Sequence, residues 1–331
     1  MEGLDYTEVL NTIIKMCKQI KVSIFCICIS LFFFNCRNKN NAYDTPENGK
    51  IFISVDESFK PVISEQIKIY QATYPKTQII ASYKSEAACF RDLQSDSTRM
   101  IIVSRGLSDD ESNYYKQTLS FKPRWDVLAY DAIDVIVNIH AKDSIFTLQQ
   151  IKSYLKGDDT TKTVVLDGKN ATSTVRVLKD SLLKGKKFGN NVYAAGSSKG
   201  VIDYISANPN AIGFVGSSWV GDLDDPEQLG YAKNIRFALV ECIRCEKGMF
   251  AKPSQATITN GDYPLFRPLY YILKENANGL GTGFVNYLVL ERGQLVFRRS
   301  YLVPAQLDFS VRRSIMETNK SLLNKKHNNN N

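Results

Sequence analysis

Short apolar runs alternate with amphipathic segments along most of the chain, and this alternation restricts the possible folds more than any other feature of the sequence. Residues 50–55, Lys-Ile-Phe-Ile-Ser-Val, have the composition of a buried strand, and Ile63, Ile67 and Tyr70 then recur at helical spacing. Further strands are predicted at residues 78–83, 100–103, 134–138, 163–167, 211–215 and 269–273, and further helices at 87–93, from 108, 148–157, from 173, 201–206 and 284–290. Strands that alternate with helices build a mostly parallel sheet with helices on both faces, so the sequence predicts an α/β fold.

The composition fits a globular protein, and the positive charge does not by itself indicate a nucleic-acid partner. With 331 residues and 44% hydrophobic content, the chain can bury one large core or two modest ones. The formal charge of +8 is partly terminal: Lys15, Lys18, Lys21, Arg37 and Lys39 lie at one end, and Arg312, Arg313, Lys320, Lys325 and Lys326 at the other. No motif of interleaved basic and aromatic residues accompanies this charge, so no nucleic-acid partner is expected.

A basic and then apolar segment near the N-terminus predicts export. Lys18 and Lys21 precede an apolar stretch at residues 22–34, which at about 13 residues is short for a membrane span and suits the core of a signal peptide. Cys36 follows, and the chain then turns abruptly polar. This arrangement resembles a bacterial lipoprotein leader, in which the cysteine is acylated and becomes the mature N-terminus. The alternatives are a signal anchor and an uncleaved leader.

Residues before Met16 are acidic where a signal peptide is basic, so both Met1 and Met16 are candidate starts of the protein. After the leader, the polar residues 37–49 read as a tether that links the lipid to the first strand. At the other end, residues 311–331 lose all periodicity and finish in an asparagine run, which predicts a disordered tail.

The cysteines that remain after the leader do not make a convincing metal site. Cys89 is alone, and Cys242 and Cys245 form a C-x-x-C pair in a chain with only two histidines. Such a pair is a poor zinc site, so neither a metal nor a cofactor is expected. In an exported protein the pair can form a local disulfide, and two buried free thiols fit the sequence equally well.

A polar turn at residues 170–176, Asn-Ala-Thr-Ser-Thr-Val-Arg, stands where a predicted strand gives way to a predicted helix. The first turn of a helix leaves backbone N–H groups unpaired and carries partial positive charge, so it can bind an anion. Ser173 and Thr174 add hydroxyl donors there, and Arg176 can share their face of the helix. The turn is therefore a candidate oxyanion site.

An ordinary helix cap explains the same residues. In that interpretation the hydroxyl of Thr172 or Ser173 caps the helix, and Arg176 pairs with Asp180 one turn later. Nothing within the turn itself decides between the two interpretations.

Two longer segments carry a resemblance to a known family. Residues 263–270 read Tyr-Pro-Leu-Phe-Arg-Pro-Leu-Tyr, and residues 208–215 read Asn-Pro-Asn-Ala-Ile-Gly-Phe-Val. With residues 49–107 and 134–157, these segments resemble the periplasmic phosphate-binding proteins of ABC importers. The resemblance implies two α/β lobes joined by two crossing strands, with an oxyanion held in the cleft between them. The implied division is: leader 1–36, tether 37–49, lobe 1 from 50–130 and 265–310, lobe 2 from 131–264, and tail 311–331.

The resemblance also implies where the ligand binds, because the family holds its anion with loops that follow strands. The matching ligand-binding candidates are Asp56, Ser58 and Phe59 after the first strand, Ser85 after the second, Ser104 and Arg105 after the third, and Ser173, Thr174 and Arg176 in the polar turn. Plain helix caps explain several of these residues equally well. Arg105 can also pair with Asp109 or with another carboxylate at the surface.

The sequence departs from the family at two of these positions. In its best-known members an aspartate that accepts the ligand's proton stands where Arg105 is, whereas Asp56 is an addition to the neighbouring loop. Asp56 can therefore restore the missing carboxylate and select phosphate over sulfate, because sulfate lacks the proton. Alternatively, Asp56 and Arg105 pair with each other, and the two changes compensate.

The resemblance favours a lipid-anchored binding protein on the periplasmic side of a bacterial membrane. It would capture phosphate or a similar oxyanion for an ABC importer permease. A lipoprotein sensor or scaffold with the same fold is the alternative, and the redox state of Cys242 and Cys245 stays open. A hydrolase is less well supported, because neither His140 nor His327 has an evident catalytic partner in the sequence.

We predict that Cys36 carries the lipid. Metabolic labelling with palmitate should mark the wild-type protein in a bacterial host and should be lost in Cys36→Ser, because the acylated thiol is then absent. Cys89→Ser serves as the control and should label normally. Label that survives Cys36→Ser would contradict the lipoprotein interpretation.

Overall fold

The computed structural model describes residues 44–168 and 172–306. The predicted leader with Cys36, the first part of the tether, the first residues of the polar turn and the tail lie outside the described residues. Within the described part of the chain, no helix is both long enough and apolar enough to cross a membrane.

Strands and helices alternate as the sequence predicts. In the first third of the chain the elements are β1 (Asn48–Asp56), the 3-10 helix η1 (Glu57–Phe59), α2 (Lys60–Thr73), β2 (Lys76–Lys84), α3 (Glu86–Leu93), β3 (Thr98–Val103) and α4 (Asp109–Leu119). The middle contains β4 (Arg124–Asn138), β5 (Ile145–Phe146), α5 (Leu148–Lys156), β6 (Thr163–Leu166), α6 (Ser173–Ser181), β7 (Val192–Ala194), α7 (Ser198–Ala207), β8 (Ala211–Gly216) and η2 (Ser217–Trp219). The last part contains α8 (Pro226–Tyr231), β9 (Ile235–Phe237), β10 (Leu239–Glu241), β11 (Phe250–Ala251), α9 (Gln255–Thr259), β12 (Phe266–Leu273), α10 (Leu280–Val289), α11 (Glu291–Arg299) and β13 (Val303–Pro304).

Lobe 1 is built around the parallel strands β2, β1 and β3, and β12 continues the sheet antiparallel to β3. Side chains of α2, α10 and α11, such as Tyr70, Phe284 and Phe297, pack with one face of this sheet. Leu93 of α3 and Tyr115 of α4 pack with the other face. The sheet therefore has helices on both faces, as the alternation of elements predicts.

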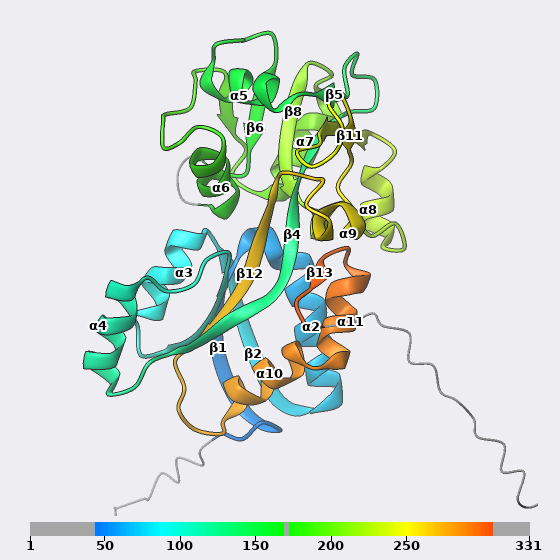
Figure 1. Cartoon of the computed structure of the whole chain (residues 1–331). Coiled ribbons are helices and arrows are strands. Elements are labelled where there is room, and N and C mark those ends of the chain that lie inside the picture. Colours follow the sequence, from blue (N-terminus) through cyan, green and yellow to red (C-terminus); the bar gives the residue numbers. More distant parts are fainter. Residues whose placement is uncertain (1–43, 169–171, 307–331) are drawn as a thin grey trace, which may run out of the picture. The chain divides into compact units, whose positions relative to one another are not determined.

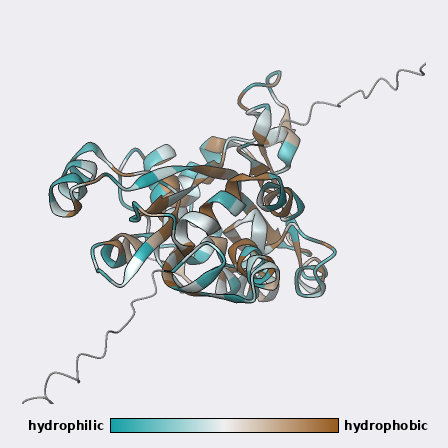
Figure 2. Cartoon of the chain, turned by 90° about the horizontal axis from the view of Figure 1, so that it is seen from below, coloured by the Kyte–Doolittle hydropathy of each residue, from teal (hydrophilic) through white to brown (hydrophobic). Residues whose placement is uncertain are grey.

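Lobe 2 is built around the parallel strands β8, β6 and β7, with β4 antiparallel to β8. Side chains of α5 and α6, including Ile151 and Leu178, form one core with Phe214 of β8. Val201 and Ile205 of α7 form a second core on the opposite face. Figure 2 shows the apolar colour concentrated on the strands and on the inward sides of the helices, whereas the outer turns are hydrophilic.

Two strands pass from one lobe to the other (Figure 1). Residues of β4 up to Ala132 pair with β12, and those from Ile133 to Val137 pair with β8. The sequence predicts only residues 134–138 of this strand, because polar side chains such as Asp126 and Asp131 interrupt the apolar run before that point. The crossing requires one long strand that pairs with both lobes. A search for short apolar runs detects only the apolar second part of this strand.

Several short elements are absent from the predicted set. A small sheet of β11, β10 and β5 closes one end of lobe 2, and Cys242 and Cys245 form a disulfide just after β10. The sequence left this pair open between a disulfide and two free thiols, and the structure contains the disulfide. The helix α11 is also new. Five of its nine side chains are polar or charged, so a search for apolar periodicity does not find the helix, although Phe297 and Gln294 are buried.

We predict that the contact between β8 and α7 leaves no room for a methyl group at Gly213. A Cβ at Gly213 would lie 2.7 Å from Ile205 Cγ1 and 2.8 Å from Val201 Cγ1, whereas a Cβ at Gly230 of α8 would have no neighbour within 4 Å. Gly213→Ala should therefore lower the free energy of unfolding by about 1–3 kcal/mol in urea titrations. Gly230→Ala is the control and should leave stability unchanged or raise it by up to about 1 kcal/mol. Equal effects of the two substitutions would contradict this account of the packing.

Candidate functional site

The polar turns that the sequence singles out meet at one buried place. Ser58 follows β1 in lobe 1, and Ser173 and Thr174 begin α6 in lobe 2; all three side chains are buried. Ser58 Oγ lies 3.5 Å from Thr174 Oγ1. The strand-to-helix turns of both lobes therefore face each other, because each turn ends its strand at the edge that points toward the other lobe.

Arg267 of β12 joins this meeting point to the crossing strands. Its Nη1 donates to Ser173 Oγ at 2.7 Å and to Thr174 Oγ1 at 2.9 Å. Its Nη2 and Nε donate to Asp131 Oδ2 at 3.0 and 3.2 Å, and neither side chain of this ion pair is exposed. The Phe59 ring packs against the guanidinium, with 4.7 Å from the ring centroid to Cζ. Arg267 is thus a fixed cation at the base of the site.

A second arginine reaches across from lobe 2 to lobe 1. Arg176 of α6 donates from Nε and Nη2 to the two carboxylate oxygens of Glu86, at 2.6 and 3.1 Å. Arg176 Nη2 also donates to Ser104 Oγ at 2.7 Å, and Ser104 in turn donates to Glu86. The helix-cap interpretation pairs Arg176 with Asp180, but Arg176 Nη1 lies 4.0 Å from Asp180 Oδ2. The contact of Arg176 with Asp180 is therefore weaker than its contact with Glu86.

Two further carboxyl groups are fully buried among these donors. Asp56 accepts from Ser58 N–H through Oδ1, and its Oδ2 has no hydrogen-bond partner among the described residues. Burial raises the pKa of Asp56 to about 7, where the charge of Glu86 adds to the rise and Arg267 opposes it. Asp167 accepts from Thr172 and Ser58, and burial raises its pKa as well.

Glu57 makes a separate bridge between the lobes. Its carboxylate accepts from Ser198 N–H at 3.2 Å and from Ser198 Oγ at 2.8 Å, at the beginning of α7. Burial raises the pKa of Glu57, and the hydrogen bonds from Ser198 oppose that rise. A carboxylate of the chain itself therefore occupies the N-terminus of a helix, which is a place that favours anions.

Two of the predicted site residues, Arg105 and Ser85, take no part in the contacts described above. Arg105 donates to both carboxylate oxygens of Glu111 at 2.8 and 2.9 Å and stacks on the Phe90 ring. The proposed pairing of Asp56 with Arg105 is therefore wrong, because Glu111, which the capping box of α4 holds in place, binds the guanidinium instead. Ser85 is the N-cap residue of α3, but its side chain makes no capping hydrogen bond.

The structure adds four residues to the predicted site: Glu86, Asp131, Asp167 and Arg267. Arg267 belongs to the motif at residues 263–270, and Asp167 ends a predicted strand. The sequence therefore indicates where both residues lie but does not predict that they contact the site. Asp131 is the cross-strand neighbour of Arg267, and this pairing of residues far apart in the chain cannot be read from the sequence. Glu86 resembles an ordinary acidic residue in the first turn of a helix.

Hydroxyl and guanidinium donors with several buried carboxyl groups can bind an anion that carries a proton. No catalytic set is evident among the described residues, since the hydroxyl groups contact carboxylates or arginines and no histidine lies beside them. The one group with metal-ligand geometry in the described part is Cys242, Cys245 and Asp262, and its two thiols are joined in the disulfide.

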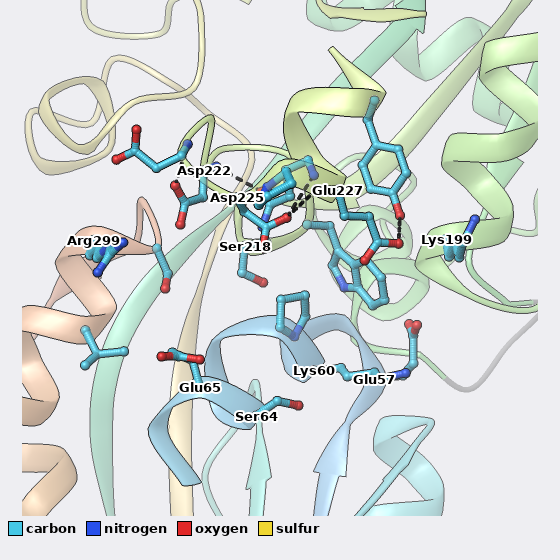
Figure 3. A pocket seen from close by; sticks show the side chains of 18 of the residues that line it. Glu57, Lys60, Ser64, Glu65, Lys199, Ser218, Asp222, Asp225, Glu227 and Arg299 are labelled. Carbon is cyan, nitrogen blue, oxygen red and sulfur yellow. Dashed lines mark hydrogen bonds between the residues drawn. The ribbon is translucent and has the colours of Figure 1, made fainter. Parts of the chain in front are cut away.

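A hollow of about 820 Å³ lies beside the site, between α2 of lobe 1 and α8 of lobe 2 (Figure 3). Glu57 and Ser218 contribute to its wall, and Ser218 donates to the Ser58 carbonyl oxygen. The charged side chains of the lining are Glu57, Glu65, Asp222, Asp224, Asp225 and Glu227, against Lys60, Lys199 and Arg299. This excess of carboxylates disfavours a free oxyanion, so the hollow is a poorer candidate for the anion site than the donor cluster beside it.

Comparison with known proteins places the chain in a family. A family model described as "PBP superfamily domain" matches residues 40–292. A protein of Pseudomonas aeruginosa named "Phosphate-binding protein PstS" is 25% identical over 260 residues, which is 71% of this chain and 76% of that protein.

Solved structures show the same fold. A phosphate ABC transporter substrate-binding protein of Clostridium perfringens, described with bound phosphate, has a TM-score of 0.64 and 21% identity, and the match covers 77% of this chain and 99% of that one. An ABC-type phosphate transport receptor of Vibrio cholerae has a TM-score of 0.57 and 18% identity over 76% of this chain and 99% of that one. The predicted two-lobed α/β fold with two crossing strands is therefore confirmed.

We predict that Asp56 makes the stability of the protein depend on pH. The folded protein holds a proton on Asp56 up to a pH of about 7, whereas the unfolded chain releases it near 3.8. This contribution is complete at low pH and is lost as the pH rises through 7. Relative to Asp56→Asn, the wild type should lose about 3 kcal/mol of unfolding free energy between about pH 4.5 and about pH 7.5 in urea titrations. The control is Asp110→Asn at an exposed position, whose free energy of unfolding should change with pH as that of the wild type does. If the wild type instead becomes more stable relative to Asp56→Asn as the pH rises, Asp56 does not hold a proton in the folded protein.

Proposed function

Because this chain belongs to the PBP superfamily, we propose that it is a solute-binding protein that captures an oxyanion between its two lobes. The proposed oxyanion is phosphate. It would deliver the anion to an ABC importer permease in the membrane. Its proposed role is binding and transfer, without a chemical reaction on the ligand. The names of its relatives and the fold support this proposal.

The observation that carries the proposal is the meeting of donors from both lobes at one buried place. Lobe 1 contributes Ser58 and Ser104, and lobe 2 contributes Ser173, Thr174 and Arg176. Hydrogen bonds of this kind to an ionised group contribute roughly 1.5–3 kcal/mol each, so a few of them suffice for micromolar binding. A ligand held by both lobes also stabilises the closed arrangement, which is how a permease can recognise a loaded protein.

The unpaired oxygen of Asp56 favours phosphate over sulfate. Inorganic phosphate carries one or two protons near neutral pH, because one of its ionisations has a pKa of about 6–7 and the last proton is lost only in strong base. A buried carboxylate with a free oxygen can accept that proton once it has lost its own, which for Asp56 happens above a pH of about 7, and in that form it repels an anion that has no proton. Asp56 Oδ2 is such an oxygen, which supports the proposal that Asp56 replaces the carboxylate that the family has at the position of Arg105.

We extend the proposal to the parts that lie outside the site. Lobe 1 would comprise residues 50–130 and 265–310, and lobe 2 residues 131–264, since the pairing of β4 changes from β12 to β8 after Ala132. Residues 1–36 would be a lipoprotein leader, so that the lipid on Cys36 and the tether hold the protein on the periplasmic side of a bacterial membrane.

A lipoprotein sensor or scaffold is the second candidate. The observation that favours it is that Glu86 and Glu57 already occupy donors that would otherwise face an anion. In a protein of this kind the two lobes would stay closed on each other without a small ligand.

We predict that Ser173 contributes directly to anion binding. Its hydroxyl accepts from Arg267, so its proton is available to Asp56, whose pKa it lowers, or to a ligand. Isothermal titration calorimetry with phosphate should therefore show a Kd about ten- to a hundredfold weaker in Ser173→Ala than in the wild type. Ser181→Ala, an exposed position at the other end of α6, is the matched control and should bind as the wild type does.

Titration with sulfate under the same conditions tests the selectivity. The wild type should prefer phosphate, and Asp56→Asn should let sulfate compete. A wild type that binds neither anion would remove the importer function and favour the sensor or scaffold.

A further inference from the structure

Glu86 has the contacts that an anion would have. Its Oε1 accepts from Ser104 N–H and from Ser104 Oγ, both at 3.0 Å, and from Arg176 Nη2 at 3.1 Å. Its Oε2 accepts from Arg176 Nε at 2.6 Å. The Glu86 residue is 4% exposed, so these donors, rather than water, surround its charge.

The donors around Glu86 belong to the proposed oxyanion site. Ser104 and Arg176 are both among the residues assigned to the ligand from the sequence, and each gives its strongest hydrogen bonds to Glu86 or to the other. Burial alone would raise the pKa of Glu86, but the hydrogen bonds and the charge of Arg176 outweigh it and lower the pKa. Glu86 is therefore an ionised carboxylate among donors suited to an oxyanion.

The Glu86–Arg176 contact also joins the two lobes. Glu86 begins α3 in lobe 1, and Arg176 lies in the first turn of α6 in lobe 2. The chain offers a matched pair for comparison, since Arg105 and Glu111 form the same two-pronged contact entirely within lobe 1. Only the first of these two pairs can hold one lobe against the other.

We propose that Glu86 is a tethered anion that closes the two lobes in the absence of ligand and must leave Arg176 and Ser104 before an oxyanion can bind. This inference rests on the proposed function for its second part, the competition with the ligand. Its first part, the closure, requires no ligand and rests on the contacts of Glu86.

The physical consequence is a weaker apparent affinity. A ligand that takes the place of Glu86 gains its own bonds to Arg176 and Ser104 but must first break four bonds that already exist. Removal of the charge of Glu86 should therefore tighten binding, whereas removal of a residue that merely orients the site should weaken it. The sign of the change in affinity separates the two roles.

The test compares Glu86→Gln with Glu111→Gln in the full chain, purified in detergent. At either position Gln keeps the size of the side chain. It removes the negative charge and replaces one of the two carboxylate oxygens that accept from the arginine with an NH2 group. Titration calorimetry with inorganic phosphate measures the competition. Hydrogen–deuterium exchange at the beginning of α7 measures the closure, because the Ser198 amide is bonded to Glu57 of the other lobe and lies far along the chain from both substitutions.

In Glu86→Gln we expect phosphate to bind about ten- to a hundredfold more tightly than in the wild type. Exchange at Ser198 should rise in the absence of phosphate and fall again when phosphate is added. Glu111→Gln should match the wild type in both measurements, since its partner lies in the same lobe.

Unchanged exchange at Ser198 in Glu86→Gln would overturn the closure, and an unchanged or weaker phosphate affinity would overturn the competition. If neither the wild type nor Glu86→Gln binds phosphate, the proposed function fails, and the exchange at Ser198 still decides whether Glu86 closes the lobes. A folding defect is recognised separately, because it raises exchange throughout the cores of both lobes and not only at their contact.

Discussion

The buried ion pair between Arg267 and Asp131 is the interaction on which the rest of the structure depends. The two residues are direct cross-strand neighbours on the strands that pass between the lobes, and neither side chain is exposed. Removal of one partner from such a pair typically costs about 3–5 kcal/mol, because the other charge stays buried without compensation. Arg267 also donates to Ser173 and Thr174, so the same guanidinium that ties the crossing strands together sets the position of α6.

The site has more carboxyl groups than cations, and this imbalance determines its chemistry. Asp56, Asp131, Asp167 and Glu86 are all buried around two guanidinium groups. Burial disfavours charge and raises the pKa values of Asp56, Asp131 and Asp167, whereas the hydrogen bonds and the charge of Arg176 lower the pKa of Glu86. A ligand that shares a proton with a carboxylate fits this environment better than a fully ionised one.

Carboxylates of lobe 1 contact donors at the beginnings of two lobe 2 helices, which pack on opposite faces of the lobe 2 sheet. Glu86 reaches Arg176 at the start of α6, and Glu57 reaches Ser198 at the start of α7. In each case a helix beginning of lobe 2 receives negative charge from lobe 1, which the helix dipole favours. The contact surface between the lobes is thus electrostatically complementary, and any anion that enters must compete with groups of the chain itself.

The sequence by itself determined the alternation of strands and helices, the positions of the polar turns and the family-like motifs at 208–215 and 263–270. These features are local or are matched segment by segment, so one chain read in order reveals them. It also marked Ser58, Ser173 and Thr174 as donors, which the structure brings together.

Only the tertiary structure decided which charges meet. Arg105 pairs with Glu111, whereas Arg176 crosses to Glu86 and Arg267 to Asp131, and the local sequence does not show which carboxylate each arginine meets. The reason is physical: the partner of a buried charge is set by which strands lie side by side and where each one ends. Strand register and strand crossing are properties of the assembled sheets. They depend on strands that lie far apart in the chain, so a short segment of the sequence does not predict them.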